Sequence, residues 1–118
     1  MADGSGLSRY NLVTADAVVS VLAHVSDDDR LRGPYVASLP VAGQAGMLAA
    51  RMRDTPAEGN AQAKTGSFSN ARALAGFVRT ADGEPLVFSI IANNYGGPSA
   101  GVDRVTDAIV VALAQFRR

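Results

Sequence analysis

Apolar residues recur with a helical spacing in two stretches of the chain. The first stretch begins after Thr14, a predicted N-cap, and ends at Asp27-Asp28-Asp29; its apolar stripe consists of Ala15, Val18, Val19, Leu22 and Val25. The second begins near Ser99 and carries one stripe made of Val102, Val105, Ile109, Ala112, Leu113 and Phe116. The pattern therefore predicts two amphipathic helices, one of them C-terminal.

Between these helices the period changes to that of β-strands. Short strands are predicted for residues 61–65, 74–80 and 86–92, with an Asp82-Gly83 turn between the last two. This order predicts a three-stranded antiparallel meander. Residues 86–92 are apolar on both faces, which is typical of a central strand that is covered on both sides.

Glycine and proline interrupt the remaining segments. Residues 1–13 contain Asp3-Gly4-Ser5-Gly6, where glycines among short polar residues predict a shaped loop. Residues 30–46 include Gly33-Pro34 and Leu39-Pro40, so little regular structure is expected there. Residues 47–53 contain good helix formers, enough for about two helical turns before Pro56.

Composition limits the classes of function. A chain of 118 residues has room for one domain with a single core, and it has no apolar run near the roughly 18 residues of a membrane span. Eleven basic residues balance eleven acidic ones, so nucleic acid is not an expected partner. Cysteine is absent and His24 is the single histidine, expected to face solvent. Disulfides, a zinc site and a histidine-based triad are therefore disfavoured, and we expect neither a metal nor a cofactor.

Lys64-Thr65-Gly66 is the tripeptide with the clearest chemistry. Lysine supplies a compact ammonium, threonine a hydroxyl beside it, and glycine a position without Cβ where another backbone can approach. At a strand end these groups suit a substrate carboxylate that lies along the strand edge. The alternative is a solvated strand end with a turn glycine, which the tripeptide taken alone favours.

In its wider context, the tripeptide resembles part of a known enzyme family. Residues 2–95 are similar to the C-terminal part of the penicillin-recognising serine D-alanyl-D-alanine carboxypeptidases of low-molecular-mass class C, peptidase family S13. The motifs that carry the resemblance, in order, are Asp3-Gly4-Ser5-Gly6-Leu7-Ser8-Arg9-Tyr10-Asn11, Leu39-Pro40-Val41-Ala42-Gly43, Ala63-Lys64-Thr65-Gly66-Ser67, Leu74-Ala75-Gly76-Phe77-Val78, Phe88-Ser89 and Asn93-Asn94. The C-terminal helix agrees with the family fold but carries no motif of its own.

The resemblance implies a role for each residue of the lysine motif. Lys64 and Thr65 would bind the terminal carboxylate of a peptidoglycan stem peptide that ends in D-Ala-D-Ala, or the equivalent carboxylate of a β-lactam. Gly66 would permit close approach. The backbone N–H of Ser67 would form half of the oxyanion hole, and losing such a donor costs about 3 kcal/mol in barrier.

The resemblance also implies a pocket for the substrate's side chain. Leu7 and Arg9 of the first loop, with Phe68 and Ser69, match the family's pocket residues, and a guanidinium there suits a diamino acid with a carboxylate, such as diaminopimelate. Each assignment has a structural alternative. Asp3 and Ser5 can serve only to satisfy backbone groups of the turn. Arg9 can be a surface residue paired with an acid, Phe68 can pack on its own sheet, and Asn93-Asn94 is interpreted as a strand-terminating turn.

The chain departs from the family in lacking its nucleophile. None of its nine serines begins the family's Ser-x-x-Lys or Ser-x-Asn motif, and Lys64 is its single lysine. In the family both motifs lie N-terminal to the matched segment. We therefore expect a C-terminal segment of an exported, extracytoplasmic peptidase that acts through an acyl-enzyme, inactive alone, with any export signal outside this chain.

Two alternatives to a peptidase segment remain. The chain could be a truncated gene product that survives as a non-catalytic binding or assembly module, which the coding sequence upstream of Met1 would decide. It could also be part of a related β-lactamase or esterase, although the loop from Asp3 to Arg9 argues against this.

The resemblance implies an α+β fold, the C-terminal portion of a serine β-lactamase/transpeptidase-like domain. Residues 1–118 would form a single partial domain of three antiparallel strands with packed helices, and the rest of the family's five-stranded sheet would be missing. Strand 86–92 would then pair with the missing N-terminal half. With that edge open, we expect dimerisation, strand exchange or association with the complementary segment.

Overall fold

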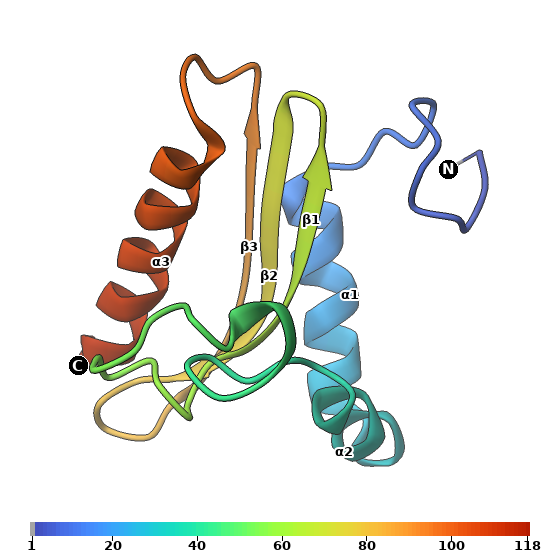
Figure 1. Cartoon of the computed structure of the whole chain (residues 1–118). Coiled ribbons are helices and arrows are strands. Elements are labelled where there is room, and N and C mark those ends of the chain that lie inside the picture. Colours follow the sequence, from blue (N-terminus) through green and yellow to red (C-terminus); the bar gives the residue numbers. More distant parts are fainter. Residues whose placement is uncertain (1) are drawn as a thin grey trace.

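The computed structural model describes residues 2–118 as three helices, a short 3₁₀ helix and one sheet (Figure 1). The elements in chain order are α1 (Ala15–Asp27), α2 (Asp29–Ala37), η1 (Gly46–Leu48), β1 (Gln62–Phe68), β2 (Ala71–Arg79), β3 (Pro85–Asn93) and α3 (Ser99–Gln115). Helix α1 begins as predicted, because the Thr14 hydroxyl accepts a hydrogen bond from the Ala17 N–H. In residues 2–118 no helix is long and apolar enough to cross a membrane.

The predicted meander is confirmed, with strand order β1-β2-β3 and antiparallel pairing throughout. The strands are longer than the sequence suggested. β1 continues past Gly66 because only two residues, Ser69 and Asn70, separate it from β2, so pairing extends to Phe68 opposite Ala71. Gly66 therefore lies within a strand and not in a turn.

The two long helices cover different faces of the sheet. Helix α3 packs against β2, and its Val110 and Ala114 belong to the core formed with Leu74 and Phe88. Helix α1 packs against β3, and its buried Leu22 and Val25 lie outside that core cluster. Figure 1 shows these helices on either side of the strands. Residues along a strand therefore alternate between the α1 face and the α3 face.

The expectation of little regular structure in residues 30–46 is wrong for its first part, because α2 forms directly after α1. The Asp28 side chain caps α2 by accepting from the Arg30 N–H at 2.8 Å. Asp28 also pairs with the Arg30 guanidinium. Pro34 lies inside this helix and supplies no N–H, which removes one helical hydrogen bond. Because α2 has no buried residues, burial does not compensate for that bond, and the cap at Asp28 is the local contact that stabilises the helix.

The two helical turns expected for residues 47–53 are also not observed. Only η1 forms, and Met52 and Asp54 adopt positive φ angles of 59° and 56°, which end any helix. The segment instead buries Leu48, Met52 and Ala57 at irregular spacing against the sheet. Tertiary burial of these side chains outweighs their helix propensity.

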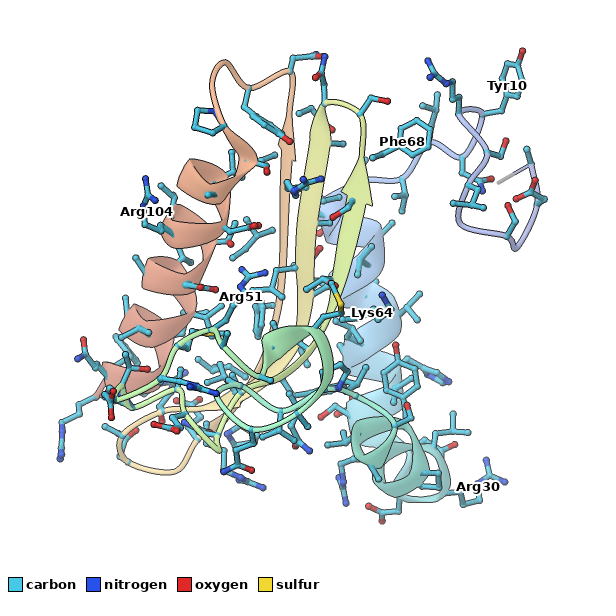
Figure 2. The ribbon with its side chains drawn as sticks, viewed as in Figure 1. Tyr10, Arg30, Arg51, Lys64, Phe68 and Arg104 are labelled. Atoms are coloured by element: carbon cyan, nitrogen blue, oxygen red, sulfur yellow. The ribbon has the colours of Figure 1, made fainter. Side chains whose placement is uncertain are left out.

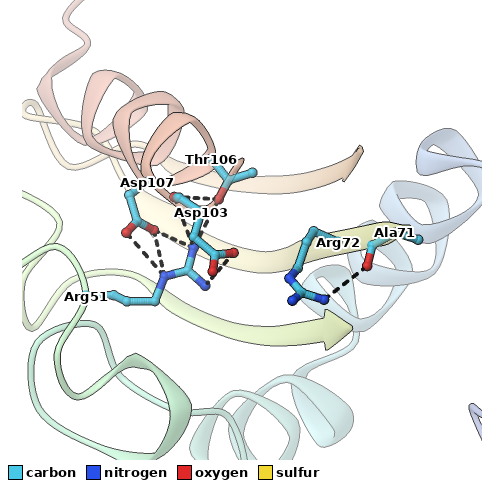
Figure 3. Close-up of polar contacts among 6 residues, drawn as sticks. All are labelled: Arg51, Ala71, Arg72, Asp103, Thr106 and Asp107. Carbon is cyan, nitrogen blue, oxygen red and sulfur yellow. Dashed lines mark hydrogen bonds and ion pairs between the residues drawn. The ribbon is translucent and has the colours of Figure 1, made fainter. Parts of the chain in front are cut away.

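Arg51 fastens this irregular segment to α3 (Figure 3). Its guanidinium donates to the Asp107 carboxylate at 2.6 and 3.0 Å and to the Thr106 hydroxyl at 3.0 Å. The Arg51 and Asp107 side chains are only 18% and 20% exposed. The pair is thus a largely desolvated, bidentate contact that fixes α3 relative to the segment leading into β1.

The predicted apolar stripe of α3 is only partly correct. The buried residues are Thr106, Val110 and Ala114, whereas Val105, Ile109 and Phe116 are 61%, 42% and 50% exposed. Thr106 is buried because its hydroxyl bonds to Arg51 and to the Asp103 carbonyl. Within residues 2–118, β3 is an edge strand, as expected if its further neighbour belongs to the missing N-terminal half of the domain.

Candidate functional site

The Lys64-Thr65-Gly66 motif lies on β1, at the edge of the sheet opposite to β3. The start of this edge is covered, because the Ala63 N–H donates to the Pro40 carbonyl and Val41 bridges to Gln62. Backbone groups point to the same side of a strand at every second residue. The N–H and C=O groups of Thr65 and Ser67 therefore point to the free edge, away from β2.

Lys64 and Thr65 present their side chains on opposite faces of β1. Thr65 pairs with Leu74, which belongs to the core under α3, so Thr65 lies on the α3 face and Lys64 on the α1 face. Lys64 is exposed, and its ammonium donates to the Thr65 carbonyl at 2.7 Å. Figure 2 shows Lys64 on the middle of this strand. The free edge is thus flanked by an ammonium on one face and a hydroxyl on the other.

Gly66 lies where β1 and β2 pack closely. A Cβ atom at this position would lie 3.2 Å from the Cβ of Ala73 on β2. Its neighbour Ser67 is exposed, and Phe68 at the end of β1 is 38% exposed. The absence of a side chain at Gly66 thus serves the pairing of β1 with β2, whatever approaches the free edge.

The N-terminal loop is closed by its own polar side chains. The Asp3 carboxylate accepts from the Ser5 hydroxyl at 2.8 Å and from the Asn11 amide at 3.1 Å. The Asn11 side-chain oxygen in turn accepts from the Ala2 N–H at 2.7 Å. Hydrogen bonds from Ser5 and Asn11 hold the pKa of Asp3 below its ordinary value of 3.8. The turn-forming interpretation of Asp3 and Ser5 is therefore confirmed.

Arg9 reaches from this loop to the end of β1. Its guanidinium carbon lies 5.3 Å from the centre of the Phe68 ring, within cation–π distance. Among residues 2–118, the acid partner considered for Arg9 is not found. Figure 2 shows the loop and Phe68 side by side, with Tyr10 pointing away into solvent. Arg9 and Phe68 are therefore brought together, although half of the chain separates them in sequence.

A cavity of about 400 Å³ lies between the loop and the sheet. Its lining combines Gly6, Ser8 and Asn11 of the loop with Gly66, Ser67 and Phe68 of β1. Its size is in the range of small-molecule sites. Of the four pocket residues expected from the sequence, Phe68 lines this cavity and the other three do not: Leu7 is 73% exposed, Ser69 lies in the exposed β1–β2 turn, and Arg9 lies over the Phe68 ring.

Three residues near the site were not among the site residues predicted from the sequence. Ser8 and Asn11 line the cavity, and Arg72 of β2 lies directly opposite Ser67. The spacing of Asp3 and Asn11 could have indicated a side-chain pair that closes a loop. Arg72 had no such signal, because its place beside Ser67 depends on the strand register. In residues 2–118, no cluster of three His, Cys, Asp or Glu side chains suits a metal ion.

Comparison with known proteins bears on the same stretch of chain. The sequence model of the family described as D-Ala-D-Ala carboxypeptidase 3 (S13) matches residues 1–116. The chain is 49% identical to a D-alanyl-D-alanine carboxypeptidase from Actinomadura sp. strain R39, over 97% of this chain and 21% of that protein. It is 39% identical to the D-alanyl-D-alanine carboxypeptidase DacB from Haemophilus influenzae, over 100% of this chain and 24% of that protein. The chain thus spans about a quarter or less of these relatives.

Solved structures agree with the sequence comparison. Penicillin binding protein 4 from Haemophilus influenzae, solved in complex with a β-lactam, superposes with a TM-score of 0.87 at 32% identity, over 98% of this chain and 28% of that one. A predatory peptidoglycan endopeptidase from Bdellovibrio bacteriovorus shares the fold with a TM-score of 0.64 at 19% identity, over 90% of this chain and 29% of that one. The expected fold class, a portion of a penicillin-binding α+β domain, is therefore confirmed. The chain belongs to the S13 family of D-Ala-D-Ala carboxypeptidases.

Proposed function

We propose that this chain forms the carboxylate-binding edge and the side-chain pocket of a serine D-Ala-D-Ala carboxypeptidase that acts on peptidoglycan stem peptides. The observation that carries the proposal is the cavity in which the N-terminal loop meets the end of β1. Its lining includes residues of the N-terminal loop and of β1, two segments that carry motifs of the resemblance. The terminal carboxylate of the peptide, or that of a β-lactam, binds beside Lys64 and Thr65.

The free edge of β1 suits an extended peptide. Thr65 and Ser67 direct their N–H and C=O groups outward, as in recognition modes where a peptide adds a strand to a sheet. On binding, the Lys64 ammonium leaves the Thr65 carbonyl, 2.7 Å away, for the substrate carboxylate. The Ser67 N–H then donates to the oxygen of the tetrahedral intermediate as half of the oxyanion hole.

The cavity under the loop suits the substrate's side chain. Arg9 lies over Phe68, which lines the cavity, and supplies a cation for a carboxylate on that side chain, such as that of diaminopimelate. Leu7 and Ser69 complete this pocket only when the ligand or the rest of the enzyme brings them nearer. The hydrogen bonds of Asp3 with Ser5 and Asn11 hold the loop in the required shape.

The chain supplies no nucleophile for acyl transfer. A Ser-x-x-Lys motif and a Ser-x-Asn motif are both absent from its sequence, and its single lysine is assigned to carboxylate binding. We therefore propose that it is inactive alone. Activity requires the rest of the domain, in an extracytoplasmic enzyme, since peptidoglycan lies outside the cytoplasmic membrane. Without nucleophile and base, the roughly 10⁶-fold or larger acceleration of enzymes is not accessible.

Titration of the ¹⁵N-labelled chain with benzylpenicillin tests binding and chemistry together. We expect amide shifts confined to residues 64–68 and the loop, and no covalent adduct by intact-mass spectrometry. Thr65→Val should weaken these shifts, because the hydroxyl donor is lost, whereas Ser20→Ala, a hydroxyl deletion on the exposed side of α1, should not. Shifts elsewhere, or an acylated serine, would contradict the proposal.

A further inference from the structure

Arg72 is a half-buried cation at the proposed site without a charged partner. It lies on β2 opposite Ser67, and the only hydrogen bond of its side chain within residues 2–118 goes to the Ala71 carbonyl at 3.4 Å. Figure 3 also shows Arg51, which by contrast has two carboxylates and a hydroxyl around it. A guanidinium carries five donors, so Arg72 retains most of its capacity to bind an anion.

The partial burial of Arg72 makes this lack of a partner informative. Removing a charge from water costs free energy unless an opposite charge or several hydrogen bonds compensate it. Arg51 is also largely removed from water, but its charge is compensated by the carboxylate of Asp107. Among residues 2–118 the chain places no acid in ion-pair range of Arg72. A bound anion would supply the missing compensation.

The register places Arg72 on the same face of the sheet as Thr65. Ser67 is its direct cross-strand neighbour, and Thr65, which pairs with Leu74, is its diagonal neighbour. Diagonal neighbours lie about 7–8 Å apart between their Cα atoms, within reach of a long side chain. Of the three cations on the strands, Lys64 lies on the other face and Arg79 at the far end of β2. Arg72 is therefore the cation on the Thr65 face of the free edge.

We propose that Arg72 is a specificity-determining residue that binds the terminal carboxylate of the ligand from the Thr65 face, while Lys64 approaches it from the opposite face. This rests on the proposed function, since it concerns the same edge of β1. Two cations that flank one edge favour a ligand with a free carboxylate over its uncharged amide. Arg72 thus selects for the chain end of a peptide.

The test compares the peptide N-acetyl-D-Ala-D-Ala with its C-terminal carboxamide, titrated into the ¹⁵N-labelled 118-residue chain. Replacing Arg72→Gln should weaken binding of the acid about 10- to 100-fold and leave the amide nearly unchanged, as for loss of one charged hydrogen bond. Arg72→Lys should recover part of the loss, because it keeps the charge. Arg79→Gln, the same change at the exposed far end of β2, is the matched control and should change neither ligand's affinity.

Each outcome separates the two proposals. If the wild-type chain prefers the acid and Arg72→Gln removes that preference with a native amide spectrum, the role of Arg72 is supported. If the acid binds at residues 64–68 equally well in both, Arg72 has no such role, although the proposed function stands. If neither ligand shifts these amides in the wild type, the proposed function fails, and the inference fails with it. If Arg72→Gln unfolds the chain, the folded Arg72→Lys variant decides: a preference for the acid that is retained wholly or in part supports a charge contact, and equal affinity for acid and amide overturns it.

Discussion

Replacing Gly76 with alanine should separate β1 from β2 and so displace the proposed site. Gly76 pairs with Ala63, one residue before Lys64. A Cβ atom at position 76 would lie 2.1 Å from the Gln62 carbonyl oxygen and 2.6 Å from the Ala63 Cα. Both neighbours are backbone atoms of β1, so no side chain can rotate to relieve the overlap.

The size of the effect follows from that geometry. Cβ atoms essentially never come closer than 3.0 Å to such neighbours. The strand β1, which carries Lys64 and Thr65, must therefore shift away from β2 by about 1 Å. Overpacking of cores costs about 1–3 kcal/mol even where side chains can adjust. A clash with backbone alone should cost about 3 kcal/mol or more, out of the roughly 6–18 kcal/mol expected for a chain of this length.

Urea denaturation followed by circular dichroism measures this loss. Gly101→Ala is the matched control, since its Cβ meets nothing closer than an Arg104 side-chain nitrogen at 3.9 Å. In the first turn of α3 alanine should be neutral or stabilise by up to about 1 kcal/mol. A Gly76→Ala chain within about 1 kcal/mol of the wild type would refute the argument that glycine is required by the β1–β2 contact.

Three further predictions follow from other contacts. Arg51→Met should lower the free energy of unfolding, measured by urea denaturation, by about 2 kcal/mol, which is less than for a fully buried pair because Asp107 keeps some exposure. The double variant with Asp107→Asn should lose less stability than the sum of the two single variants. Because the pKa of Asp3 is lowered, the loop should persist as pH falls below 3.8 and open only under more acidic conditions; the Ser5 amide shift reports the midpoint, which Asn11→Ala should raise. The chain should dimerise through the open β3 edge. Ser89→Pro removes a backbone N–H that points away from β2, so light scattering of this variant should show the 12.2 kDa monomer. A monomeric wild type would contradict this prediction.

The sequence predicted the sheet well and the helices unevenly. The alternating and β-branched runs specified three strands in the correct order, because consecutive strands with short turns can hardly pair otherwise. The stripe of α3 was predicted less well, since Thr106 is buried for its bonds to Arg51, while Val105 and Ile109 are apolar and exposed. A hydropathy pattern cannot predict the burial of a polar side chain, because that burial depends on a hydrogen-bond partner from another part of the chain.

The sequence by itself determined the family motifs, the three strands, the capped helix α1 and the absence of Ser-x-x-Lys and Ser-x-Asn motifs from the chain, because these depend on local spacing and residue identity. Only the tertiary structure brought Arg9 onto Phe68, closed the cavity between the N-terminal loop and β1, and set Arg72 beside Ser67. Those relations depend on strand register and on packing between segments far apart in the chain. A one-residue slip of β2 would move Arg72 to the other face and undo them, although the composition would be unchanged.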